Sequence, residues 1–223
     1  MRLTPRIKIC CIRDRTEAQL AIRHGASALG LVSAMPSGPG VIDEDTIADI
    51  AASVPPPIAT FLLTCLSDAD AIIDQQRRCG TNTLQLVDAV PMRTYAMLRR
   101  ALPGISIVQV IHVRDAESVS MACEIAPQVD ALLLDSGNPT LPIKQLGGTG
   151  RTHDWALSQR IVQECGKPVY LAGGLRADNV VEALAAVQPF AVDLCSGVRT
   201  DGRLDETKLA AFFAAVHLCG APT

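Results

Sequence analysis

Residues 169–198 read VYLAGGLRADNVVEALAAVQPFAVDLCSGV, and this stretch decides the fold class. Two short apolar runs, 169–171 and 191–194, have the length and composition of buried β-strands. The segment between them, 179–187, has the composition of a helix. A strand, a helix and a second strand in this order make a βαβ unit, which builds parallel sheets.

The same alternation extends over the whole chain of 223 residues. The strands expected from it are 7–12, 28–32, 58–63, 83–86, 106–113, 131–135, 169–171 and 191–194. The helices expected between them are 17–24, 43–54, 68–79, 92–102, 116–126, 154–165, 179–187 and 208–217. Asp43 is expected to cap the N-terminus of the second helix, and Pro55 to Pro57 are expected to end that helix. Gly25 and Gly80 follow the first and third helices, at the position where C-terminal caps prefer glycine. Eight strands and eight helices predict an α/β protein with a single (β/α)8 TIM barrel, one domain over residues 1–223.

The composition narrows the classes of function. Hydrophobic residues make up 48% of the chain and aromatic residues 3%, so the core is expected to be aliphatic. The formal net charge is -3 and there is no basic block, which argues against a nucleic-acid partner. No apolar run reaches the roughly 18 residues of a membrane span, and the apolar run near the N-terminus is too short for a secretory signal. We therefore expect a cytoplasmic protein with no membrane partner.

The cysteines show no metal-ligand spacing. Eight are scattered along the chain without a CxxC pair: Cys10, Cys11, Cys65, Cys79, Cys123, Cys165, Cys195 and Cys219. A disulfide framework is typical of short secreted chains. Free thiols in a reducing compartment and no metal site are expected.

Two side chains capable of proton transfer lie on expected strands. Cys10 lies in the first strand, and Asp135 ends the sixth after an apolar run. A carboxyl group directly after a buried strand sits at the catalytic end of a barrel, where low polarity raises its pKa into a range useful for a general acid. The alternatives are a capping role for Asp135 and a packing role for Cys10.

Glycine-rich turns follow the last two strands. Gly173 and Gly174 follow the seventh, and Ser196 and Gly197 follow the eighth. In such barrels these two turns frequently bind phosphate through backbone N–H groups. The long connection from Ser136 to His153 follows the sixth strand, and a loop of this length is usually functional, either as a lid or as a substrate loop.

Six motifs along the chain resemble the phosphoribosylanthranilate isomerase family of tryptophan biosynthesis. They are KIC (8–10), HGASALGLV (24–32), LLLDS (132–136), GGTGRTHDW (147–155), LAGGLRADNV (171–180) and VDLCSGV (192–198). The last four are in the family's order and spacing, and the family versions read roughly LLLDS, GGTGKTFDW, LAGGLTPENV and VDVSSGV.

The resemblance implies an aldose–ketose isomerase that carries out an Amadori rearrangement on a phosphosugar substrate. It assigns Cys10 as the general base and Asp135 as the general acid, and it implies neither a metal nor an organic cofactor. The residues that match substrate or phosphate contacts are Gly147, Gly148, Gly173, Gly174, Asp193, Ser196 and Gly197. Whether the protein is a monomer or a homodimer stays open.

The first half departs from the family pattern at three places. Where the family has KICG, this chain has Cys11 in place of the glycine. The family's SPR turn, whose arginine holds the anthranilate carboxylate, ends in Gly40 here. The family's QLHG has Val87 in place of the histidine and Asp88 in place of the glycine. Arg13, in the first loop, is a candidate replacement for the missing cation.

Two thiols near the first strand raise further expectations. Strand alternation turns Cys11 away from Cys10 and toward the helix layer. Cys195, on the neighbouring eighth strand, is expected to approach Cys10 or Cys11 as a redox-sensitive pair.

Three functional hypotheses remain. The first is the isomerase itself, with a diverged pocket for the group attached to the sugar. The second is a paralogue that acts on another phosphorylated sugar or aminated aldose, which the losses at Gly40 and Val87 favour. The third is a non-catalytic phosphometabolite-binding barrel, against which the presence of both Cys10 and Asp135 argues.

Overall fold

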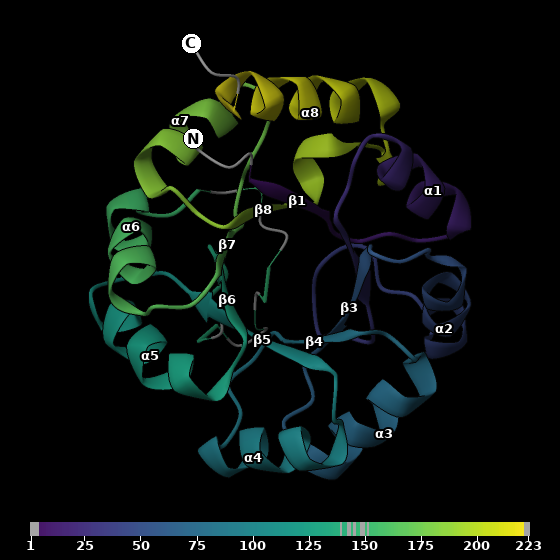
Figure 1. Cartoon of the computed structure of the whole chain (residues 1–223), viewed down its shortest axis with the longest axis vertical. Helices are drawn as coiled ribbons and strands as arrows, with labels where there is room; N and C mark the ends of the chain where they lie inside the picture. The colour runs from purple at the N-terminus through teal and green to yellow at the C-terminus, as the bar shows by residue number, and fades with distance from the viewer. Residues whose placement is uncertain are drawn as a thin grey trace.

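The chain folds as a closed parallel barrel. The structure, a computed structural model, describes residues 5–138, 140–141, 144, 146–147, 150 and 152–220. Strands β1 to β8 pair in order, and β8 closes on β1 (Figure 1). The strands are β1 (Arg6–Ile9), β2 (Ala28–Val32), β3 (Ala59–Thr64), β4 (Thr83–Leu86), β5 (Ser106–His112), β6 (Ala131–Asp135), β7 (Val169–Leu171) and β8 (Ala191–Leu194). The expected TIM barrel is confirmed.

A helix follows each strand and lies outside the barrel, so that the helices form the ring seen in Figure 1. They are α1 (Arg15–Arg23), α2 (Glu44–Ser53), α3 (Ala69–Cys79), α4 (Met92–Ala101), α5 (Glu117–Ile125), α6 (Trp155–Glu164), α7 (Val180–Val187) and α8 (Glu206–Gly220). Because both faces of the sheet are covered, the strands read as continuous apolar runs rather than alternating ones.

The hydrophobic residues form two layers. The larger layer lies between the strands and the helices and includes Leu29, Ile50 and Phe212, all fully buried. The smaller layer fills the barrel interior with side chains such as Phe61 and Leu133. Aliphatic side chains dominate both layers, as the small aromatic content predicts.

Local signals set several helix ends. The carboxylate of Asp43 accepts a hydrogen bond from the Thr46 N–H at 2.7 Å, so it caps α2 as expected. Gly80 ends α3 in the left-handed conformation, at φ 64°, which glycine adopts without strain.

The first strand is shorter than predicted. It ends at Ile9 rather than at residue 12, because Cys11 has φ 63° and leaves the extended conformation. A short helix η2 (Ser196–Val198) and a hairpin of β9 (Arg199–Thr200) and β10 (Arg203–Leu204), which the sequence did not predict, follow β8.

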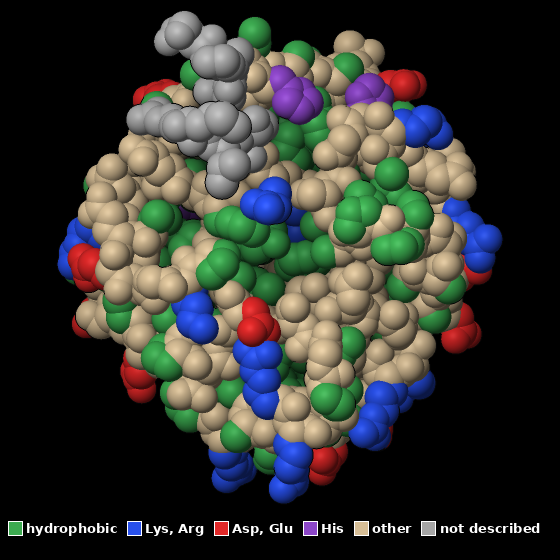
Figure 2. All heavy atoms as spheres, viewed as in Figure 1, with side chains coloured by type: hydrophobic (Ala, Val, Ile, Leu, Met, Phe, Trp, Pro, Cys, Tyr) green, Lys and Arg blue, Asp and Glu red, His purple; other side chains and the backbone are tan. Residues whose placement is uncertain are grey.

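Charges of both signs are interspersed on the surface. On the face in Figure 2, basic and acidic side chains both lie around the rim, with basic ones more numerous along the lower edge, while hydrophobic side chains gather toward the middle. None of the described helices has the length and apolar character needed to cross a membrane.

Candidate active site

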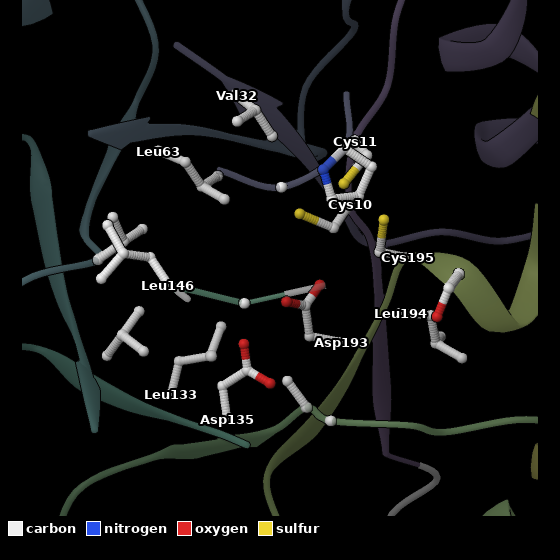
Figure 3. Close-up of a pocket in the computed structure, with 18 of the residues that line it drawn as sticks. Cys10, Cys11, Val32, Leu63, Leu133, Asp135, Leu146, Asp193, Leu194 and Cys195 are labelled. Carbon is white, nitrogen blue, oxygen red and sulfur yellow. The ribbon is translucent and has the colours of Figure 1, made fainter. Parts of the chain in front are cut away.

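One pocket opens at the C-terminal end of the barrel, where TIM-barrel enzymes hold their active sites. It comprises about 740 Å³ of space, the open solvent at its mouth included. Residues that follow β1, β6, β7 and β8 meet in it (Figure 3). Its polar side chains are those of Cys10, Cys11, Ser37, Gln85, Asp135, Asp193, Cys195 and Ser196, and the rest of the lining is apolar or glycine.

Cys10 follows the last residue of β1 and lies inside the barrel. Its backbone N–H donates to the Leu194 carbonyl at 2.7 Å, and the residue is 6% exposed. Gly30 on β2 makes room for the thiol, because a Cβ at Gly30 would lie 2.8 Å from the Cys10 sulfur. Figure 3 shows the sulfur directed into the pocket, on the side that Asp193 and Asp135 also face.

A buried ion pair lies beneath this thiol. Lys8 is fully buried, and its Nζ donates to Oδ1 of Asp193 at 2.9 Å across the β1–β8 seam. Burial pulls the pKa of Lys8 down, but the charges of Asp193 and Cys10 raise it above its ordinary value. The pair with Asp193 therefore favours the charged form of this lysine, next to Cys10.

The thiol of Cys10 is more acidic than an ordinary cysteine. A hydrogen bond from the Cys11 side chain lowers its pKa, burial opposes this, and the Lys8 charge lowers the pKa further. The negative charge of Asp193 acts in the opposite direction. The net result favours a thiolate, which is the form that can accept a proton.

Asp135 has the opposite character. It is 8% exposed, and burial raises its pKa to about 6, with a further contribution from the charge of Asp193. The Ser136 N–H donates to its Oδ1 at 2.7 Å and partly offsets the shift. A carboxyl group with this pKa holds its proton for a substantial fraction of the time near neutral pH, as a general acid must.

Gly147, from the long loop after β6, lies over this carboxyl group. A Cβ at position 147 would lie 2.6 Å from Oδ2 of Asp135, and the backbone has φ 144°. Only glycine allows the loop to approach the acid so closely. Leu146 also lines the pocket, so this part of the loop borders the site as expected.

The glycine turns lie together at one side of the pocket. Gly173, Gly174, Ser196 and Gly197 all line it, and the Leu175 carbonyl packs against Gly197, where a Cβ would be 2.0 Å away. Among the described residues, no hydrogen bond uses the N–H groups of Gly173 or Gly174. These donors fit a phosphate group. Gly148 lies outside the described residues.

Two expectations about the first loop are corrected. Arg13 is exposed, its Nη1 lies beside Gly202, and it does not line the pocket, so the structure does not bring it to the site. Cys11 does not face the helix layer, because its φ of 63° ends the strand alternation and directs the side chain into the pocket. Cys195 lies near Cys11 at the edge of the pocket, as Figure 3 shows.

A second buried ion pair supports the site, and sequence reasoning missed it. Nη2 of Arg199 lies 3.0 Å from Oε2 of Glu17, and the two side chains are 6% and 10% exposed. The same Nη2 donates to the carbonyls of Cys10 at 3.2 Å and Cys11 at 2.5 Å. Because Glu17 and Arg199 are 182 positions apart, no local pattern indicates the contact.

The remaining departures from the family pattern also lie around the pocket. Val87 lines the pocket as an apolar side chain, whereas Asp88 forms an ion pair with Lys144. Gly40 packs against Cys11, where a Cβ would come within 2.4 Å of the Cys11 Cβ. Among the described lining residues there is no lysine, arginine or histidine.

Comparison with known proteins agrees with this geometry. The family model described as N-(5'phosphoribosyl)anthranilate (PRA) isomerase matches residues 7–215. The N-(5'-phosphoribosyl)anthranilate isomerase of Haloferax volcanii is 36% identical over 94% of this chain and 92% of its own length, and that of Nostoc punctiforme is 37% identical over 93% and 96%. The crystal structure of phosphoribosyl anthranilate isomerase from Thermotoga maritima superposes with a TM-score of 0.81 at 26% identity, over 96% of this chain and 98% of that one. The chain belongs to the N-(5'-phosphoribosyl)anthranilate isomerase family.

Proposed function

We propose that the protein isomerises N-(5'-phosphoribosyl)anthranilate, an aminated aldose phosphate, to the corresponding 1-deoxyribulose phosphate. One observation carries the proposal. A thiol whose pKa is lowered and a carboxyl group whose pKa is raised, those of Cys10 and Asp135, line the same pocket beside the glycine turns. An acid and a base with pKa values shifted in opposite directions are what the reaction requires.

In the first step Asp135 donates its proton to the furanose ring oxygen. The C1–O bond breaks, the ring opens, and the nitrogen lone pair forms an iminium at C1. Burial raises the pKa of Asp135 to about 6, so near neutral pH a larger fraction of this carboxyl group carries a proton than of a surface carboxyl group with an ordinary pKa.

In the second step the Cys10 thiolate removes the proton on C2. The electron pair of the C2–H bond forms the C1–C2 double bond, the iminium nitrogen becomes neutral, and an enolamine results. Tautomerisation of the enolamine gives the ketose. The turns at Gly173–Gly174 and Ser196–Gly197 would hold the phosphate, which fixes C1 and C2 relative to the two catalytic groups.

The test is growth of a tryptophan auxotroph that lacks this isomerase, together with the fluorescence assay of substrate loss in vitro. Growth restored by the chain and abolished in both Cys10→Ala and Asp135→Asn supports the proposal. Each substitution should lower kcat/KM by about 10²–10⁴-fold. Soluble expression without growth or turnover contradicts it.

A second candidate function has its own observation. The described lining residues carry two carboxylates and no cation, and Gly40 leaves no side chain beside Cys11. An anionic aglycone is disfavoured in such a pocket, which favours a phosphoribosylamine whose aglycone lacks a carboxylate. A kcat/KM for the aniline-derived phosphoribosylamine that exceeds the value for the anthranilate substrate would select this function.

A further inference from the structure

Cys11 has a backbone conformation that its residue type rarely adopts. Its φ is 63°, in the left-handed region, and only Gln188 and Asp201 share this property among the described non-glycine residues. A side chain with a Cβ is strained there, whereas glycine is not. Strained residues of this kind persist where the surroundings impose the conformation, and they cluster at active sites.

Contacts on two sides impose the conformation on Cys11. On one side Arg199, paired with Glu17, binds the carbonyls of Cys10 and Cys11 through Nη2. On the other side Gly40 lies so close that a Cβ there would be 3.2 Å from the Cys11 sulfur and closer still to its Cβ. The backbone is thereby fixed, and the thiol is directed into the pocket rather than toward α1.

The position of Cys11 joins three thiols. Figure 3 shows the sulfur atoms of Cys10, Cys11 and Cys195 grouped at one edge of the pocket, and the Cys11 thiol interacts with both of the others. The described residues contain no group of three His, Cys, Asp or Glu side chains placed to hold a metal ion. The arrangement is therefore a chain of thiols that ends on the proposed base.

The surroundings favour the anion on Cys10 rather than on Cys11, because Lys8 lies beside Cys10: a Cβ at Gly30 would be 2.8 Å from the Cys10 sulfur and 3.0 Å from Nζ of Lys8. Hydrogen bonds to Cys10 and Cys195, together with burial, raise the pKa of Cys11 well above its ordinary value, while the pKa of Cys10 is lowered. The other charged groups that face Cys10 are Lys8 and Asp193, which are paired with each other and act in opposite directions. Asp135 faces the same pocket from β6.

We propose that Cys11 is a positioning residue for the base: its S–H donates to the sulfur of Cys10 and keeps that sulfur in the thiolate form. The inference deepens the proposed function, since it rests on Cys10 as the base. The strain at Cys11 is what places the donor, because an extended residue at this position would turn its side chain away from Cys10.

The test is the pH dependence of iodoacetamide alkylation at Cys10, followed by fragment masses that separate Cys10 from Cys11. Cys11→Gly removes the donor and suits φ 63°, so the variant should have a higher melting temperature. Its midpoint for Cys10 alkylation should move up by about one pH unit or more. Cys11→Ser keeps a donor, and its midpoint should stay near that of the unsubstituted protein. Cys65→Ser, a cysteine outside the pocket lining, is the matched control and should leave the midpoint unchanged.

Turnover gives a second readout. The acidic limb of kcat/KM should move with the alkylation midpoint in Cys11→Gly, while KM changes little. A Cys11→Gly protein that alkylates at the same pH as the unsubstituted protein overturns the inference, and so does a Cys11→Ser protein that behaves like Cys11→Gly. Absence of turnover in the unsubstituted protein contradicts the proposed function instead, and the alkylation experiment still decides the role of Cys11.

Discussion

Replacing Asp135 by asparagine should make the protein more stable and nearly inactive. The native carboxyl group has a pKa of about 6 against an ordinary value of 3.8, chiefly because it is buried. The difference, 6 − 3.8, is about 2.2 units, and at about 1.36 kcal/mol per unit the ionised form costs about 3 kcal/mol of folding free energy. Asparagine has nearly the same shape, carries no charge, and can still accept the hydrogen bond from Ser136.

The sign of the pH dependence follows from the direction of the shift. Because the pKa of Asp135 is raised in the native state, its stabilising contribution is fully present below pH 3.8 and is lost as the pH rises through 6. The Asp135→Asn protein should therefore exceed the unsubstituted protein in free energy of unfolding by about 3 kcal/mol at pH 8 and by about half as much at pH 5.

Urea unfolding followed by circular dichroism at the two pH values measures this difference. Asp49→Asn is the matched control, since Asp49 is an exposed carboxylate paired with Arg15 and should change the free energy by less than about 0.5 kcal/mol. An Asp135→Asn protein no more stable than the unsubstituted one at pH 8, or with the same advantage at pH 5 and pH 8, would refute the reasoning. In the same preparations kcat/KM should fall by about 10²–10⁴-fold.

Two further predictions concern contacts outside the acid. Arg199→Gln leaves Glu17 buried without its partner and should lower the free energy of unfolding in urea by about 3–5 kcal/mol. Arg160→Gln breaks an exposed ion pair and, as the control, should lower it by less than about 0.5 kcal/mol. Equal losses in the two variants would show that the buried pair stabilises the fold no more than the exposed one does. The sulfur atoms of Cys123 in α5 and Cys165 at the end of α6 lie 3.0 Å apart, so treatment with diamide should form a disulfide bond between them. Peptide mapping that finds both thiols still open to alkylation after this treatment would contradict the prediction.

Much of the barrel could be predicted from the sequence because its signals are local. The strand Ala131–Asp135 has the predicted bounds, since an apolar run that is buried on both faces needs no knowledge of its neighbours. The N-cap at Asp43 and the left-handed C-cap at Gly80 likewise depend on residues a few positions away. The candidate acid was found for the same reason, as it ends such a run.

The surroundings of the base could not be predicted, because they depend on distant contacts. The ion pair of Glu17 and Arg199 joins α1 to the segment after β8, and that of Lys8 and Asp193 depends on the β1–β8 register. The expectation for Cys11 was wrong because alternation was extended past Ile9. One signal was present, since the resembled family has glycine at the position of Cys11, and a glycine after a strand often marks a positive φ.

Two of the three departures from the family pattern are one structural change. Cys11 adds a side chain where the pattern has glycine, and Gly40 removes one where it has arginine. The two residues are in contact, and a Cβ at position 40 would lie 2.4 Å from that of Cys11. A side chain at position 40 therefore cannot coexist with Cys11 in its present place, whatever its charge. Loss of the arginine and gain of the second thiol are thus linked by the space they share, and the exchange replaces the cation of the family pattern with a second thiol in the pocket beside Cys10.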